Sequence, residues 1–158
     1  MIEPATPFCL KTSLDHLPEA KRQQLQEITR LLRRSNLKVH YLILFGSYAR
    51  GDWVEDPDNH YFSDYDLLVL AAKREIKKAE RWAIWERQTK ALTGNTPITL
   101  LTHTLNEVNE ELRLDNYFFS DIIKEGIVLY ADGKQQLIVP QQLSPEERLI
   151  VANRNLHR

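Results

Sequence analysis

The sequence has few of the features that mark secreted or membrane-bound proteins. Its one cysteine, Cys9, cannot form a disulfide within the chain, which fits a reducing compartment. No stretch approaches the roughly 18 uninterrupted apolar residues of a membrane-spanning helix. The start of the chain, MIEPATPFCL, does not join a basic segment to an apolar run as a secretory signal does. We therefore expect a cytoplasmic protein without a membrane partner.

An excess of charge of one sign is also absent. The 21 Lys and Arg residues balance the 22 Asp and Glu residues to a net charge of −1, which gives no bulk attraction to nucleic acid. A basic run from Lys73 to Arg81 includes Glu75 and Glu80, so a solvated helix face is favoured over a nucleic-acid site. With 158 residues, 42% of them hydrophobic, the chain can form one domain with a sizeable core.

Local patterns predict helices and strands along the chain. Apolar residues at helical spacing predict one helix from Pro18 to about residue 36 and another over 73–92. Thr104 and Glu107 have the spacing of a capping box for a third helix, which Asn116 separates from a fourth. Short runs rich in β-branched and aromatic residues predict strands at 39–45, 65–70, 97–103 and 127–131. This order is typical of an α/β or α+β domain with one sheet.

Several predictions concern smaller features of these elements. Gly94 suits the C-cap of the helix over 73–92. We expect residues 135–139 (QQLIV) to pair back across a turn at Asp132–Gly133. Residues 117–119 are three adjacent aromatics that cannot all face inward from one helix, so one of them is expected to contact a partner or stack on a base. The predicted helix over 73–92 has four residues on one face: Trp82, Trp85, Thr89 and Leu92.

The end of the first predicted strand suits a phosphate group. The strand runs into Gly46–Ser47, and the segment SYAR can form the first turn of a helix, whose unpaired N–H groups and dipole attract anions. Gly46 lets the backbone approach a phosphate without a Cβ in the way, and Ser47 can add a hydroxyl donor. Arg50 could pair with a phosphate or with a nearby carboxylate. A Gly-Ser pair by itself also fits a plain tight turn.

Two carboxylates begin the second predicted strand. Asp64 and Asp66 lie two residues apart, so both project from the same face, and without compensation the pKa of at least one would rise. A divalent cation removes that cost, and carboxylate oxygens together with substrate phosphates suit one or two Mg²⁺ ions. Alternatively, Asp64 caps a turn and Asp66 faces solvent on an edge strand. The Gly-Ser turn upstream and the apolar run downstream favour the metal site.

These residues resemble a known family signature. Gly46-Ser47, the Ala49-Arg50-Gly51 that follows, and Ser63-Asp64-Tyr65-Asp66-Leu67 are similar to the paired motif of the DNA polymerase β-like nucleotidyltransferase superfamily, and most similar to its minimal nucleotidyltransferase (MNT) group. The resemblance covers residues 37–131. It implies the nucleotidyltransferase fold, a mixed sheet flanked by helices, together with Mg²⁺, ATP as substrate and transfer of AMP to an acceptor hydroxyl. It also implies a protein partner, because many MNT proteins are antitoxins that adenylylate HEPN-domain toxins and others are fused to a HEPN domain.

The chain departs from the family pattern at two places. Between Ser47 and Asp64 there are 64 − 47 − 1 = 16 residues, where compact members have about 10. The surplus predicts an insertion within 52–62, in a loop that covers the nucleotide or contacts the acceptor. The family's third carboxylate aligns with Thr99, which cannot replace it as a metal ligand or as a base. Its substitutes would be His103 as general base or an acid of the loop: Asp52, Glu55, Asp56 or Asp58.

These observations predict three parts. Residues 1–36 are a lead-in and a helix that packs on the domain, 37–131 are the nucleotidyltransferase core, and 132–158 are an extension opened by a capping box at Ser144 and Glu147. The extension is the root of a second, HEPN-like domain or a segment that docks on a partner. The expected function is AMP transfer to a HEPN-type toxin, with Asp64, Asp66 and His103 as catalytic residues. The alternatives are a degenerate nucleotide-binding module that acts by contact, and an aminoglycoside nucleotidyltransferase.

Overall fold

The computed structural model describes residues 10–134, 136–138, 140 and 144–156. The first nine residues of the predicted lead-in, and positions 135 and 139 of the predicted strand 135–139, lie outside this range. In chain order the elements are α1 (Glu19–Arg34), β1 (Val39–Phe45), α2 (Ser47–Arg50), β2 (Glu55–Asp56), β3 (Tyr61–Phe62), β4 (Tyr65–Ala71), α3 (Lys73–Ile76), α4 (Ala79–Thr93), β5 (Ile98–His103), α5 (Leu105–Arg113), α6 (Tyr117–Glu125), β6 (Ile127–Ala131) and α7 (Pro145–Leu156).

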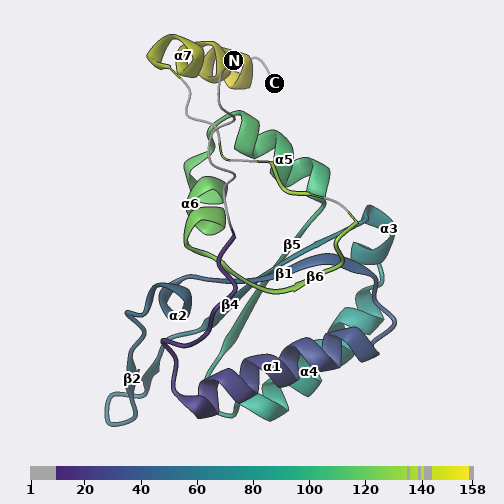
Figure 1. Ribbon diagram of the computed structural model, residues 1–158, viewed down its shortest axis with the longest axis vertical. Helices are drawn as coiled ribbons and strands as arrows, with labels where there is room; N and C mark the ends of the chain where they lie inside the picture. Colours follow the sequence, from purple (N-terminus) through teal and green to yellow (C-terminus); the bar gives the residue numbers. More distant parts are fainter. Residues whose placement is uncertain (1–9, 135, 139, 141–143, 157–158) are drawn as a thin grey trace, which may run out of the picture.

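A mixed sheet of four strands in the order β5-β4-β1-β6 forms the middle layer (Figure 1). β1 pairs antiparallel with β4 and with β6, whereas β4 and β5 run parallel. The helices α1 and α4 cover one face, α5 and α6 cover the other, and α7 lies beyond α5 and α6 (Figure 1). The predicted fold class, a mixed sheet flanked by helices, is therefore confirmed.

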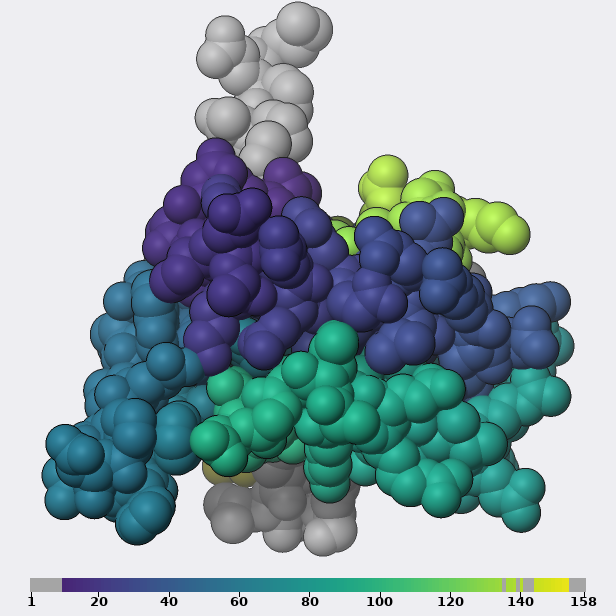
Figure 2. Space-filling model, turned by 90° about the horizontal axis from the view of Figure 1, so that it is seen from below, coloured from purple at the N-terminus to yellow at the C-terminus, as the bar shows by residue number. Residues whose placement is uncertain are grey.

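The central strands are buried on both faces because their side chains alternate between two cores. In β4, Leu67 and Val69 belong to the core that includes the α1 and α4 residues, and Leu68 and Leu70 belong to the core that includes the α5 and α6 residues. Figure 2 shows α1 and α4 side by side over the first core. Residues two apart in a strand share a face, so Asp66 lies on the α5–α6 side of the sheet with Leu68 and Leu70.

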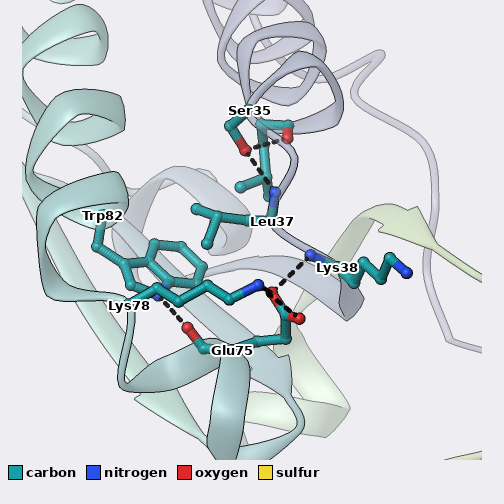
Figure 3. A network of polar contacts seen from close by, with 7 residues as sticks. Ser35, Leu37, Lys38, Glu75, Lys78 and Trp82 are labelled. Atoms are coloured by element: carbon teal, nitrogen blue, oxygen red, sulfur yellow. Dashed lines mark hydrogen bonds and ion pairs between the residues drawn. The ribbon is translucent and has the colours of Figure 1, made fainter.

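The helix expected over 73–92 is two helices, α3 and α4, which meet at Lys77–Lys78. Glu75 is buried, and its carboxylate accepts hydrogen bonds from Lys78 Nζ at 2.9 Å and from the backbone N–H of Lys38 at 3.2 Å (Figure 3). Trp82 Nε1–H donates to the Glu75 carbonyl oxygen at 2.9 Å. These bonds tie α3 to the start of β1 and redirect the chain. The prediction of one continuous helix is therefore wrong, because tertiary contacts of Glu75 outweigh the local helical pattern.

The predicted face of this helix is confirmed in part. Trp82, Trp85 and Thr89 are buried, but Leu92 is exposed and Thr93 is buried in its place. The helix over residues 79–93 starts six residues later than expected, and the following Gly94, at φ +61°, forms the C-cap as predicted.

The predicted caps at the other helix ends are also present. Thr104 Oγ1 accepts a hydrogen bond from the Glu107 N–H at 3.1 Å. Asn116 separates α5 from α6 as expected, and its side chain also caps α6, which was not predicted. Ser144 and Glu147 form their capping box, with each side chain accepting from the other residue's N–H at 3.1 Å.

The strand predicted at 135–139 is wrong at the positions that the structure describes. Residues 136–138 form no strand. Instead, the Ile138 N–H donates to Asn109 Oδ1 at 2.9 Å, and Asn109 Nδ2 donates to the Gln136 carbonyl at 3.3 Å. The side chain of one α5 residue thus satisfies the backbone groups that a partner strand would otherwise have paired.

None of the helices in the described part of the chain is both long enough and apolar enough to span a membrane.

Candidate nucleotide and metal site

Antiparallel pairing of β1 and β4 brings the two predicted motifs together. Phe45 at the end of β1 lies opposite Asp66 near the start of β4, so the turn at Gly46 lies against the acidic pair. Gly46 has φ +75°, and a Cβ placed there would overlap the Asp66 carboxylate. Glycine is required here for two independent reasons, the left-handed backbone and the lack of space.

The chain continues from Gly46 into the short helix α2. The N–H groups of Ala49 and Arg50 bond to the Gly46 carbonyl, and the N–H groups at the very start of such a helix have no partner within it. Gly51, at φ +102°, ends the helix in the left-handed conformation. Tyr48 and Ala49 are buried and fix α2 against the core, so its first N–H groups are held at the mouth of the sheet.

The acidic pair lies at the start of an interior strand, with Asp64 just before β4 and Asp66 within it. β4 lies between β1 and β5, so the alternative in which Asp66 faces solvent from an edge strand is wrong. Burial raises the pKa of Asp66 to about 6, the negative charge of Asp64 adds to this, and the positive charge of Arg50 opposes it. A carboxylate pair with this cost of ionisation is one that a divalent cation stabilises.

Thr99 lies beside the pair, as its alignment with a third carboxylate would require. It is the register partner of Asp66 in the parallel β4–β5 ladder, and its hydroxyl donates to Asp64 Oδ2 at 2.6 Å. The hydrogen bond orients the Asp64 carboxylate, but Thr99 adds no negative charge. A third acid in this place would have been a further metal ligand.

Pocket residues from four parts of the chain surround the pair. The pocket has a volume of about 720 Å³, within the range of small-ligand sites. Its lining comes from the β1–α2 turn, the β2–β3 segment, the start of β4 and one side of α6: Phe45, Gly46, Ser47, Arg50, Asp52, Val54, Tyr61, Phe62, Ser63, Asp64, Asp66, Phe118, Asp121, Ile122 and Glu125.

Arg50 is placed between carboxylates of this lining. Its guanidinium donates to Glu125 at 3.3 Å and pairs with Asp52 at 3.3 Å. The pKa of Arg50 lies above its usual value, chiefly because of the hydrogen bond to Glu125. Because these contacts lie at an exposed rim, they are weak enough to be exchanged for a phosphate oxygen.

The donor set fits magnesium only in company with a substrate. Within the described residues, no three side chains of His, Cys, Asp or Glu form a group that could hold a metal ion by itself. Asp64 and Asp66 would supply two carboxylates, and Mg²⁺ usually completes its coordination with phosphate oxygens and water. The arrangement therefore suits a metal that enters with a nucleotide.

The other candidates for a third acid or base lie away from the pair. His103 is at the opposite end of β5, where it is the register partner of Leu70 and contacts Glu107 and the Phe119 ring. It does not line the pocket, so the prediction of His103 as general base is corrected: a strand places residues 99 and 103 roughly 13 Å apart.

The loop acids divide in the same way. Glu55 pairs with Lys21, and the Asp56 carboxylate accepts a hydrogen bond from Asn59 Nδ2 at 2.7 Å. Asp58 is exposed and does not line the pocket. Asp52 does line it, but it pairs with Arg50. Of the four loop acids proposed as substitutes, only Asp52 is therefore near the pair.

The wall formed by α6 was not predicted. Phe118, Asp121, Ile122 and Glu125 line the pocket, and their spacing of three, four and seven residues places them on one face of the helix. That spacing is a signal in the sequence, with two acids on an otherwise apolar face. It could have been recognised only by knowing that α6 packs beside the start of β4.

A family model described as "Polymerase beta, Nucleotidyltransferase" matches residues 26–135, more than half of the chain. No curated protein matches the sequence.

Two solved structures are similar to this chain. One, described as a toxin-antitoxin with AMP-PNP, has 18% identity and a TM-score of 0.44, with 84% of this chain and 87% of that chain covered. The other is a tri-AMPylated Shewanella oneidensis HEPN toxin in complex with MNT antitoxin, at 16% identity and a TM-score of 0.45, with 87% of each chain covered. On the family match and its extent, this chain belongs to the polymerase beta nucleotidyltransferase family.

Proposed function

We propose that this protein is a Mg²⁺-dependent nucleotidyltransferase that transfers AMP from ATP to a hydroxyl group of a protein partner. The observation that carries the proposal is the contact between the Gly46 turn and the Asp66 carboxylate, with Asp64 in the same pocket. The proposed site for phosphate at Gly46 and the proposed site for a divalent cation at Asp66 would then be adjacent, as transfer of a nucleotidyl group requires.

The residues around the Gly46 turn and the acidic pair have separate roles in this reaction. The first N–H groups of α2 and the Ser47 hydroxyl bind phosphate oxygens, and Arg50 exchanges its carboxylate partners for one. Bound Mg²⁺, held by Asp64 and Asp66, would neutralise the charge that develops on the phosphates. The acceptor oxygen attacks the α-phosphorus, the bond from that phosphorus to the bridging oxygen breaks, and pyrophosphate leaves. The hydroxyl proton passes to a pocket carboxylate or to water.

The partner that we propose is a HEPN-type toxin in the cytoplasm, with this chain as its antitoxin. The resemblance of the paired motif to the MNT group supports this choice. The segment 132–158, which includes α7, would then be the root of a fused HEPN-like domain or the part that docks on a separate HEPN protein.

Transfer is tested with ATP labelled at the α-phosphate. Incubation with Mg²⁺ and a candidate HEPN protein should label the partner, whereas ATP labelled at the γ-phosphate should not. Asp64→Asn combined with Asp66→Asn should abolish labelling, and Asp56→Asn, a matched change of a surface carboxylate outside the pocket, should not. Labelling that persists in the double variant would contradict the assignment of Asp64 and Asp66 as catalytic residues. An aminoglycoside in place of the protein tests the small-molecule alternative.

The position of Thr99 favours a second candidate, a module that binds nucleotide and metal and regulates its partner by contact alone. Thr99 stands where a third carboxylate would complete the site and donates to Asp64 instead. This candidate predicts a complex with the partner that persists in the double Asp variant and no labelling by the unmodified chain.

Thr99→Asp tests whether the missing third carboxylate limits the transfer of AMP. If the unmodified site already transfers AMP slowly, a carboxylate at residue 99 should raise the rate by roughly 10²- to 10⁴-fold, the usual contribution of a positioned base. Thr99→Asn, which is similar in shape but cannot accept the proton, is the control. An unchanged rate in Thr99→Asp would show that Thr99 does not limit the reaction.

A further inference from the structure

The segment inserted between the two motifs is an ordered hairpin fixed to the domain. β2 and β3 pair antiparallel, with Glu55 opposite Phe62 and Asp56 opposite Tyr61. Figure 2 shows this part of the chain projecting at one corner of the molecule, beside α1. Below its two strands, the Val54 N–H donates to Ser63 Oγ at 2.8 Å, and the Ser63 N–H donates to the Val54 carbonyl at 2.9 Å.

Side chains from the core hold the base of this hairpin. The Trp53 ring stacks on the buried Tyr48 ring, with centroids 5.4 Å apart and planes inclined by 13°. Lys21 of α1 forms an ion pair with Glu55, and its Nζ lies 5.4 Å from the Tyr48 centroid. The hairpin is therefore placed in part by Tyr48, which also fixes α2, the helix proposed to bind phosphate.

From Val54 onward the hairpin presents an uncharged wall to the pocket, and the Asp52 that precedes it is paired with Arg50. Val54, Tyr61 and Phe62 all line it, and the Tyr61 side chain is 58% exposed. An aromatic ring left open to solvent on a fixed strand is suited to stack on another flat ring, and it loses little conformational entropy when it does so.

The opposite wall has different chemistry. Phe118, which is 52% exposed, lies there with Asp121 and Glu125. Glu125 is paired with Arg50, but Asp121 adds a further negative charge, which disfavours a polyphosphate and does not disfavour an acceptor surface that is neutral or basic. The two walls are therefore not equivalent for a nucleotide whose phosphates lie at Gly46 and Ser47.

We infer that Tyr61 is the platform on which the base of the nucleoside triphosphate stacks, so that the inserted hairpin is the nucleoside subsite and the α6 wall is left to the acceptor. This role presupposes the phosphate and metal site proposed above. It adds a specificity-determining residue that lies in the insertion and outside the paired motif. Because every base has a flat face, we expect no strict selection of one base. Because the larger purine rings stack more strongly, we expect purine triphosphates to bind more tightly than pyrimidine triphosphates.

The test compares ATP with inorganic tripolyphosphate, which has the phosphates but no base. Affinities of the full chain for both ligands are measured in Mg²⁺ by titration calorimetry. Tyr61→Ala should weaken ATP binding roughly 5- to 100-fold and change tripolyphosphate binding by less than about twofold. Tyr61→Phe, which keeps the ring, should bind both ligands like the unmodified chain. Phe118→Ala, the matched loss of an exposed ring from the other wall, should not weaken ATP binding selectively over tripolyphosphate binding.

The other outcomes overturn the inference in distinguishable ways. Equal weakening of both ligands by Tyr61→Ala would mean that the residue acts through the phosphate site, and no weakening would mean that the base lies elsewhere. A selective loss of ATP binding in Phe118→Ala would place the base on the α6 wall. If the unmodified chain binds tripolyphosphate as tightly as ATP, the nucleoside subsite fails while the phosphate site stands. If it binds neither ligand, the proposed function fails as well.

Discussion

At the scale of single residues, Gly46 is where one methyl group would disturb both the backbone and the acidic pair. Its φ is +75° and a Cβ would overlap the Asp66 carboxylate. Gly46→Ala should lower the free energy of unfolding by about 1–2 kcal/mol through backbone strain and should also weaken Mg²⁺–ATP binding by at least about tenfold, because Asp66 must move.

Gly94→Ala is the matched control for this prediction. Gly94 has φ +61° but nothing within 4 Å of its Cβ position. Gly94→Ala should therefore lower the free energy of unfolding, measured by urea denaturation, as Gly46→Ala does, but it should leave the affinity for Mg²⁺–ATP unchanged. Equal losses of affinity in the two variants would contradict the role of Gly46 at the site.

The raised pKa of Asp66 makes stability depend on pH in a predictable direction. The folded chain holds this proton up to about pH 6, whereas an ordinary Asp loses it near 3.8. Without divalent cations, the contribution of Asp66 to stability is therefore complete at acid pH and is lost as the pH rises through about 6. Asp66→Asn removes this dependence. The variant should gain roughly 1–2 kcal/mol relative to the unmodified chain between pH 4 and pH 7.

Asp56→Asn is the control for this titration, because the pKa of Asp56 is lowered by hydrogen bonds from Asn59. Its contribution to stability is present at neutral pH and is lost on acidification, which is the opposite sign. Urea denaturation of the three proteins in EDTA at several pH values checks both directions. A pH-independent difference between Asp66→Asn and the unmodified chain would contradict the assignment.

At the scale of elements, α4 depends on Trp85, which anchors it to α1. Trp85 is fully buried, and its Nε1–H donates to the Ile28 carbonyl at 3.3 Å. Trp85→Ala should lower the free energy of unfolding by about 3–5 kcal/mol, the usual cost of removing a large aromatic from a core. Leu92→Ala, on the exposed side of the same helix, should cost less than about 1 kcal/mol. Both losses are measured by urea denaturation. Similar losses in Trp85→Ala and Leu92→Ala would contradict the packing of Trp85 against α1.

At the scale of the whole molecule, α7 is joined to the domain through Arg148. Its guanidinium donates to Asp115 Oδ2 at 2.7 Å and lies 5.0 Å from the Tyr117 ring centroid. Figure 1 shows α7 at the far end of the molecule from α2 and the hairpin. Removal of residues 144–158 should therefore lower the melting temperature by no more than about 2–4 °C, equivalent to roughly 1 kcal/mol, and keep ATP binding intact.

Arg148→Ala in the full chain is the companion to this truncation. It removes the polar attachment of α7 but keeps the helix, and it should cost a similar amount of stability. Calorimetry measures both unfolding and ATP binding of the truncated chain. Loss of cooperative unfolding or of ATP binding would show that α7 is part of the core of the domain.

The sequence by itself determined the parts of this protein whose cause is local. Val39–Phe45 is a strand because most of its residues are apolar and several are β-branched or aromatic. α5 and α6 begin after Thr104 and Asn116 because those side chains accept hydrogen bonds from N–H groups two or three residues further on. The Gly46–Ser47 and Asp64–Asp66 motifs were recognisable for the same reason, since each is defined within a few residues.

Only the tertiary structure decided which distant residues meet. Thr99 reaches Asp64 across 35 positions because β5 runs parallel to β4 in one register, and that same register carries His103 away from the site. The break between α3 and α4 depends on Glu75 bonding to Lys38, and the pocket gains its second wall from α6. Local patterns specify an element and the face that it buries, but the order and register of strands depend on contacts across the whole domain.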